Sequence, residues 1–262
     1  MEALLDLHEC TVQFGGLTAV NALSLQIGPN DLVGLIGPNG AGKTTVFNII
    51  TGIYKPTSGT ITLAGSSIVG RKASAIAERG IARTFQNIRL FESLTVFDNV
   101  RAAFTMRLRH GIAHALWRGK PFLKEEREIN AQVLEILSIF QLEKAHGVAC
   151  KSLSYGDQRR LEIVRALATR PKLLLLDEPA AGMNPSEKDD LMKLIQFVKE
   201  KFQIAVLLVE HDMKVVMGIC QRIVVLDYGV KIAEGSPEEI RRNPKVIEAY
   251  LGEETTPPAP TP

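Results

Sequence analysis

Short apolar runs separated by glycine and proline dominate the two ends of this chain. Leu5 to Phe14 and Ala19 to Ile27 alternate between apolar and polar residues, which is the pattern of half-buried strands, and glycines follow each run. Other runs are continuously apolar, as expected of strands buried on both faces of a parallel sheet. The predicted strands of this second kind are Leu32 to Ile36, Lys172 to Leu176, Ile204 to Val209 and Ile223 to Leu226, with a shorter one at Ile61 to Leu63.

The middle of the chain, from Ala73 on, has a mostly helical pattern instead. Apolar residues recur at three- and four-residue spacing within 95–108, and 122–140 is a second amphipathic stretch. Helices are also expected between the later apolar runs. These are Arg159 to Thr169, Ser186 to Phe202 and Asp212 to Cys220, and Tyr228-Gly229 is predicted to be a hairpin turn.

This order of elements predicts an α/β fold with three parts. The core, 1–86 and 158–252, would have a mostly parallel sheet and carry an N-terminal antiparallel β subdomain. A helical subdomain, 87–157, would be inserted into it. The last residues, 253–262, are proline-rich and polar, so we expect a disordered tail there.

A glycine-rich loop lies between the predicted strand Leu32 to Ile36 and the next apolar helix, and it fits the pattern G-x-x-x-x-G-K-[ST]. Such glycines let successive N–H groups face inward, and the helix adds its positive N-terminal end, so the loop can cradle phosphates. Lys43 would bind the β- and γ-phosphates and Thr44 would hold Mg²⁺. The core is therefore predicted to be a P-loop NTPase. Its expected nucleotide-binding residues here are Gly37, Pro38, Asn39, Gly40, Ala41, Gly42, Lys43, Thr44 and Thr45.

Two carboxylates, Asp177 and Glu178, directly follow four leucines of a predicted buried strand. Acids at this point would lie at the carboxyl edge of the sheet, where α/β proteins bind ligands. Asp177 would complete the Mg²⁺ shell, directly or through water, and Glu178 would polarise the attacking water. The alternative is that these two acids are solvated residues that only end the strand. The phosphate loop upstream argues against this alternative.

The segment Leu153 to Gln158 narrows the function further. Ser154, followed three residues later by Asp157, is a helix-capping pattern. The same string also matches L-S-x-G-x-Q, the signature of the ABC ATPases, so from Leu4 to Gly252 the chain resembles the ATP-binding subunit of an ABC transporter. The nucleotide would then be ATP, and the resemblance assigns nucleotide-binding roles to Ser154, Gly156, Asp157 and Gln158.

The resemblance implies roles for three more residues. Gln86 stands where the family has its glutamine loop, which senses Mg²⁺ and the attacking water and connects to the membrane subunit. His211 matches the switch histidine that contacts the γ-phosphate, and Phe14 matches the aromatic residue that stacks on adenine. Glu178, His211 and Gln86 are thus the expected catalytic residues, and Thr44, Gln86 and Asp177 the expected metal ligands. The alternative for Phe14 is an apolar strand residue of the core.

One position departs from the common family pattern and points to a particular branch. Most ABC ATPases have an aspartate where this chain has Asn184, which with Pro185 and Glu187 is also a good helix start. The stretch Pro179 to Pro185 nevertheless resembles the subunits that serve branched-chain amino acid import. Two further stretches agree with this branch, 80–87 and 243–252.

The resemblance implies an assembly at the cytoplasmic face of the cell membrane, where this chain would be peripheral. Two ATPase subunits, identical or paralogous, would face each other head to tail and share their sites. The other partners would be transmembrane permease subunits and, through the complex, a solute-binding protein. Related branches that move urea or amides, or lipopolysaccharide, are the alternative. A soluble ABC ATPase of repair or translation fits less well, because the chain has one cassette and only a short insertion.

Composition agrees with these expectations. The chain has 262 residues, 45% of them hydrophobic and 23% charged, with a net charge of +2, so we expect no nucleic-acid partner. No apolar run approaches the ~18 residues that span a bilayer, and no secretory signal pattern is visible. His110 and His114 have helical spacing but no matching further ligand, so a metal site is not predicted there. Trp117 is expected to pack within the insertion.

Overall fold

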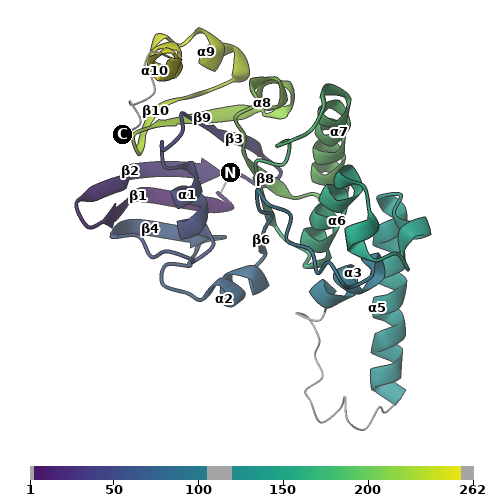
Figure 1. The fold of residues 1–262 in the computed structure, drawn as a ribbon. Coiled ribbons are helices and arrows are strands. Elements are labelled where there is room, and N and C mark those ends of the chain that lie inside the picture. Colours follow the sequence, from purple (N-terminus) through teal and green to yellow (C-terminus); the bar gives the residue numbers. More distant parts are fainter. Residues whose placement is uncertain (1–2, 105–119, 255–262) are drawn as a thin grey trace, which may run out of the picture.

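The computed structural model describes residues 3–104 and 120–254, and two β-sheets form its framework (Figure 1). The N-terminal part builds a four-stranded antiparallel sheet in the order β2-β1-β4-β5. A long β1–β2 hairpin forms because the apolar positions alternate, which buries one face of each strand. The strands are β1 (Leu5–Phe14), β2 (Leu17–Ile27), β4 (Ser58–Leu63) and β5 (Ser66–Ser67).

The second sheet has six strands in the order β10-β9-β3-β8-β7-β6. Its strands are parallel except for β10, which pairs with β9 as an antiparallel hairpin at one edge. The bounds are β3 (Leu32–Ile36), β6 (Ile81–Arg83), β7 (Leu173–Asp177), β8 (Ala205–Val209), β9 (Arg222–Asp227) and β10 (Val230–Gly235).

Successive residues of the central strands point into two separate apolar cores. In β7, Leu173 and Leu175 join the core beneath the antiparallel sheet, which also contains Phe47. Leu174 and Leu176 join the opposite core, which the helices cover. This strand is therefore apolar at successive positions, because neither face of the sheet meets water.

Helices lie on both sides of the parallel sheet (Figure 1). On one side α1 packs between the two sheets, and on the other α6 and α7 cover the sheet while α3 and α5 pack with α6 as a helical group. The helices are α1 (Lys43–Ile50), α2 (Ala73–Glu78), α3 (Val96–Phe104), α5 (Lys120–Ile139), α6 (Tyr155–Ala168), α7 (Pro185–Phe202), α8 (Met213–Ile219), α9 (Pro237–Arg242) and α10 (Pro244–Glu254), with 3₁₀ turns at Glu143–Ala145 and Cys150–Ser152.

The predicted fold class is confirmed, with differences at short elements. The strands β5 and β6 and the helices α9 and α10 were not predicted, whereas β10 follows the predicted hairpin turn at Tyr228-Gly229. β6 has only three residues, too few for a periodic pattern, and it exists because it pairs with β7. α10 runs to Glu254, so it includes the first two residues of the predicted tail. The rest of that tail, together with His110, His114 and Trp117, lies outside the described residues.

Four parallel neighbours, β3, β8, β7 and β6, end at the same edge of the sheet. The glycine-rich loop follows β3, the acids end β7, and His211 and Gln86 come shortly after β8 and β6. Parallel pairing thus brings four distant segments of sequence to one edge. Among the described residues, no helix is long and apolar enough to cross a membrane.

Candidate functional site

Glycines at two positions of the phosphate loop are required by close backbone approach. Gly37 (φ 150°) and Gly42 (φ 100°) have left-handed backbone angles. A Cβ atom at Gly37 would lie 2.0 Å from the carbonyl oxygen of Leu226, and one at Gly42 would lie 2.5 Å from that of Ala19. No side chain fits there, so the loop is held against β9 and β2.

Lys43 is the first residue of α1, and its side chain is turned into the loop. Its ammonium donates hydrogen bonds to the carbonyl oxygens of Gly37 at 2.6 Å and Pro38 at 2.8 Å. The loop turns tightly because Ala41 N–H donates to the Pro38 carbonyl. A buried positive charge and the N-terminal end of an eight-residue helix thus share one small volume, which suits an anion. Asn39, Gly40 and Thr44 are exposed at the mouth of this loop and Thr45 is half-buried beside it.

Asp177, the last residue of β7, is paired with an arginine that the sequence did not single out. Its Oδ2 accepts a hydrogen bond from Arg83 at 2.7 Å, and both side chains are more than nine-tenths buried. The second guanidinium nitrogen of Arg83 donates to Asn48 Oδ1 on α1. The carboxylate thus has a fixed cation beside it in a place with little water.

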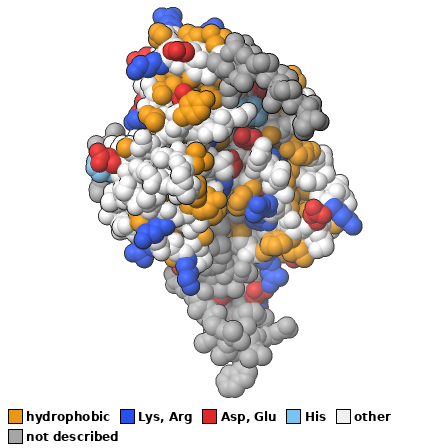
Figure 2. All heavy atoms as spheres, turned by 60° about the vertical axis from the view of Figure 1, so that its left-hand side comes forward, with side chains coloured by type: hydrophobic (Ala, Val, Ile, Leu, Met, Phe, Trp, Pro, Cys, Tyr) orange, Lys and Arg blue, Asp and Glu red, His pale blue; other side chains and the backbone are white. Residues whose placement is uncertain are grey.

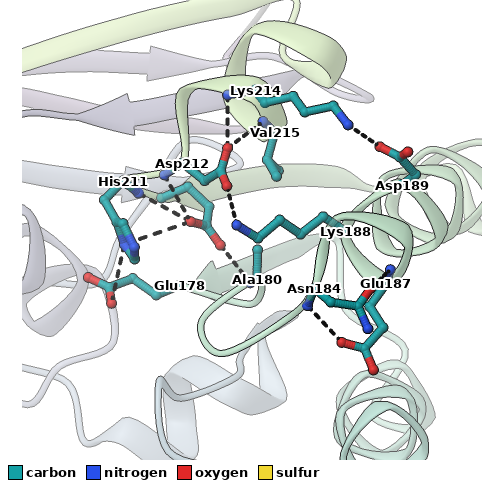
Figure 3. Close-up of polar contacts among 11 residues, drawn as sticks. Glu178, Ala180, Asn184, Glu187, Lys188, Asp189, His211, Asp212, Lys214 and Val215 are labelled. Atoms are coloured by element: carbon teal, nitrogen blue, oxygen red, sulfur yellow. Dashed lines mark hydrogen bonds and ion pairs between the residues drawn. The ribbon is translucent and has the colours of Figure 1, made fainter.

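Glu178, Gln86 and His211 meet at the carboxyl edge of the sheet. Gln86 Nε2 donates to Glu178 Oε2 at 2.7 Å. His211 Nδ1 lies 3.8 Å from the same oxygen (Figure 3). Glu178 has a left-handed backbone (φ 45°), and its N–H donates to the carbonyl of Val209 at the end of β8. Such a conformation in a residue other than glycine stores strain, and this is common at catalytic positions.

Glu210, fully buried between β8 and His211, fixes the turn that carries the histidine. One carboxylate oxygen accepts from Ala180 N–H at 2.6 Å, and the other accepts from the N–H groups of His211 and Asp212. Burial raises the pKa of Glu210, and these backbone hydrogen bonds partly oppose the rise. Sequence reasoning missed this residue, although an acid directly after a buried strand was a usable signal.

Asp212 caps α8 and connects it to α7. Its Oδ1 accepts from the N–H groups of Lys214 and Val215, and Oδ2 accepts from Lys188 (Figure 3). The Lys188 hydrogen bond lowers the pKa of Asp212, which keeps the cap ionised. Asn184 caps α7 in a capping box with Glu187, as its position predicted. The loop that carries His211 is therefore held from both flanks.

The segment 153–158 starts α6 and presents part of its backbone to solvent. Ser154 accepts from Asp157 N–H and donates to the Asp157 carboxylate, while Gln158 Nε2 donates to the Leu153 carbonyl. A Cβ atom added to Gly156 would have no heavy atom within 4 Å, so this side of the helix start is open. These side-chain hydrogen bonds of Ser154 and Gln158 join residues of the 153–158 segment itself. The capped start of α6 therefore lies at the surface.

Arg159 and Glu162, one turn further along α6, form a buried ion pair that sequence reasoning also missed. Their atoms Nη1 and Oε2 lie 2.9 Å apart, and the side chains are 1% and 2% exposed. Arg159 also donates to the carbonyls of Phe85 and Gln86, each at 2.8 Å. Glu162 accepts from the N–H groups of Phe85 and Arg89. The pair therefore fastens α6 to the backbone around Gln86.

Phe14 ends β1 with 44% of its surface exposed and packs edge-on against Tyr54, with ring centroids 5.1 Å apart. Val20 on β2 lies close to Gly42 of the phosphate loop, and it pairs with Val12, two residues before Phe14. An exposed aromatic face thus stands on the hairpin that borders the loop. Tyr54 is a second aromatic group at this place that the sequence did not indicate.

A sequence profile of the family described as ABC transporter matches residues 20–181, which span the phosphate loop, the 153–158 segment and the acidic pair. The match covers more than half of the chain. This chain belongs to the ABC transporter family. A second profile, described as branched-chain amino acid ATP-binding cassette transporter, matches residues 230–256. The predicted family and the predicted ATPase class are confirmed.

Similar proteins resemble this ABC cassette over nearly its whole length. The high-affinity branched-chain amino acid transport ATP-binding protein BraF of Pseudomonas aeruginosa is 46% identical over 95% of this chain and 98% of its own. LivG of Escherichia coli, described in the same words, is 47% identical over 96% and 99%. The lipopolysaccharide export system ATP-binding protein LptB of Escherichia coli is 34% identical over 92% and 94%.

Solved ABC cassettes have the same fold. The ADP conformation of MJ1267, an ATP-binding cassette of an ABC transporter, superposes with a TM-score of 0.83 at 29% identity, covering 96% of this chain and 100% of that one. The dimeric post-hydrolysis state of the cassette MJ0796 bound to ADP and Pi gives 0.73 at 26% identity, covering 89% and 98%. This ABC cassette is therefore an ATP-binding α/β protein with a helical insertion.

Mg²⁺ suits the donor set at the sheet edge of this ABC cassette. Mg²⁺ prefers oxygen ligands, needs only one or two carboxylates and takes the rest from phosphates and water. Asp177 offers a buried carboxylate, Thr44 an exposed hydroxyl at the start of α1, and Gln86 an amide oxygen at the same edge. The described residues contain no cluster of three or more His, Cys, Asp or Glu side chains that could hold a metal ion.

Replacing Lys43 by alanine is expected to weaken ATP binding by roughly 10- to 150-fold, the range for a lost hydrogen bond to a charged group. Phosphate oxygens would take the place of the two loop carbonyls that Lys43 now bonds. Titration of a fluorescent ATP analogue in EDTA measures this effect without metal. Lys55→Ala, at an exposed lysine just after α1, is the matched control. Equal affinities in the two variants would disprove the role of Lys43.

Proposed function

We propose that this chain is the ATP-hydrolysing subunit of a membrane importer for branched-chain or other hydrophobic amino acids. The observation that carries the substrate class is the match of residues 230–256 to the branched-chain amino acid cassette profile. Relatives named for branched-chain amino acid transport, 46% and 47% identical over nearly full length, support it. The chain would act at the cytoplasmic face of the membrane as a peripheral subunit.

In this proposal the residues at the sheet edge divide the work of hydrolysis. Lys43 and the loop N–H groups bind the phosphates, and His211 contacts the γ-phosphate. Glu178 accepts a proton from the attacking water, which Gln86, hydrogen-bonded to the same carboxylate, helps to orient. Thr44, Asp177 and Gln86 would hold Mg²⁺, which when bound neutralises charge on the phosphates.

Two such subunits would be needed for one complete site. The capped start of α6, with Ser154 and Gly156, is open to solvent and has the positive end of a helix. A second ATPase subunit, identical or paralogous, would place its own α6 start against the phosphates at Lys43. A dimeric arrangement is described for the cassette MJ0796, and that likeness supports the proposal.

A cleft beside the Gln86 loop suits a permease segment. It has a volume of about 470 Å³ and lies between the edge strand β6 and the helices α2, α3 and α6. Its lining is mainly apolar, and Phe91 and Ile53 are each about half exposed there. Because Arg159 and Glu162 hold the backbone of residues 85–89, a segment docked in this cleft could sense how Gln86 and Glu178 are arranged.

Co-purification tests the proposal directly. The chain is tagged in its native cell, membranes are extracted in mild detergent, and bound proteins are identified by mass spectrometry. We expect two membrane subunits, a second ATPase and an associated solute-binding protein that binds branched-chain amino acids. Ribosomal or DNA-bound partners without membrane subunits would refute the transport role and leave the ATPase chemistry standing.

An export or urea system is the alternative, and the same experiment separates it. The likeness to LptB is weaker, 34% against 46–47%, and favours the importer. Recovery of lipopolysaccharide-transport membrane subunits, or of a binding protein that holds urea or an amide, would reassign the solute without changing the assignment of the site.

A further inference from the structure

Arg83 makes several contacts in the site besides its ion pair with Asp177. Its guanidinium carbon lies 5.3 Å from the ring centre of Phe47 and 5.1 Å from that of Phe85. Nη1 donates to Asn48 and Nη2 donates to Asp177, each at 2.7 Å. The guanidinium is thus anchored by two rings and two oxygens, which come from α1, β7 and the segment after β6.

The bond to Asp177 engages one of the two oxygens of the carboxylate proposed to bind Mg²⁺. The guanidinium group of arginine carries a fixed positive charge in proteins. The Arg83 side chain is only 7% exposed. Its Nε has no hydrogen-bond partner among residues 3–104 and 120–254. Within the described residues its ion-pair partner is Asp177.

We propose that Arg83 competes with the divalent cation for Asp177, so that the cation binds well only when nucleotide phosphates supply further negative charge. Two positive charges that share one carboxylate repel each other, and the low water content around them reduces the screening. The anchors on Phe47, Phe85 and Asn48 keep Arg83 from swinging away. Arg83 is in this sense a positioning residue. The inference rests on the proposed metal role of Asp177.

Mn²⁺ binding to the purified full chain, with and without ADP, tests the proposal. Free Mn²⁺ is measured by electron paramagnetic resonance, so the readout does not depend on hydrolysis. In the unmodified chain ADP should raise the affinity for Mn²⁺ strongly. Arg83→Met should tighten Mn²⁺ binding without ADP by about tenfold, the effect of removing one like charge nearby, and should shrink the gain from ADP. Arg83→Lys, which keeps the charge, should stay near the unmodified chain.

The control variants make each outcome decisive. Arg89 lies over the same Phe85 ring at 4.2 Å and is exposed, so Arg89→Met should leave Mn²⁺ affinity unchanged. If thermal melting shows that Arg83→Met does not fold, Arg83→Gln replaces it, because glutamine can still donate to Asp177 without a charge. Unchanged or weaker Mn²⁺ binding in a folded neutral variant overturns the competition.

Asp177→Asn separates this inference from the proposed site on which it rests. If that variant binds Mn²⁺ with ADP as tightly as the unmodified chain does, the metal role of Asp177 is wrong, and the inference about Arg83 is overturned with it. If Asp177→Asn weakens Mn²⁺ binding while the neutral Arg83 variants do not tighten it, the metal role stands and only the competition is refuted.

Discussion

Replacing Glu178 by glutamine is expected to lower the ATPase rate at least a hundredfold, the lower end of what a general base contributes. Glutamine is nearly isosteric, and its amide can still meet Gln86, so the loop after β7 should keep its place. The amide cannot accept a proton from water, however. ATP should then remain bound, and we expect a nucleotide-trapped dimer.

Phosphate release measures the rate, and size-exclusion chromatography with ATP detects the dimer. Glu200→Gln, on the exposed face of α7, controls for the loss of one acidic charge and should hydrolyse ATP normally. Full activity in the Glu178 variant would remove Glu178 from the role of base. A slow variant that stays monomeric with ATP would instead refute the shared site and leave the role of the base intact.

The order and spacing of residues along the chain predict much of the site, because the proposed site residues directly follow strands. Because β3, β8 and β7 are parallel neighbours, their carboxyl ends lie at one edge of the sheet, and the phosphate loop, Glu178 and His211 follow these ends. The contact of Gln86 with Glu178 depends on β6, a three-residue strand with no periodic signal. Only the resemblance to the family indicated Gln86.

The residues that sequence reasoning missed are those whose partners lie far away along the chain. Arg83 lies within the stretch 80–87, but its partners Asp177 and Asn48 are separated from it by 94 and 35 positions. Arg159 and Glu162 have the spacing of an ordinary exposed helix pair, and their burial follows from tertiary packing alone. Local patterns predict which elements form, whereas a buried charge is recognised only after the elements pack.

Replacing Arg159 by methionine is expected to lower the free energy of unfolding by about 3–5 kcal/mol, the usual loss when one partner of a buried ion pair is removed. Glu162 would remain buried without its cation, and the carbonyls of Phe85 and Gln86 would each lose a donor. Chemical denaturation of the purified chain measures the difference. Because the backbone of Gln86 would also be released, we expect slower hydrolysis in the variant that remains folded.

Two comparisons show whether burial of the charge causes this loss. Arg160→Met removes the next arginine, whose ion pair with Asp157 is only half-buried, and should cost less than about 1 kcal/mol. The double variant Arg159→Met with Glu162→Leu should recover part of the stability, because no unpaired charge stays in the core. If Arg159→Met lowers the free energy of unfolding no more than Arg160→Met does, the Arg159–Glu162 pair does not hold the Gln86 loop against α6. If the pair only stabilised the fold, the double variant would regain both stability and hydrolysis rate. Recovery of stability without recovery of the rate would show that the pair also positions Gln86.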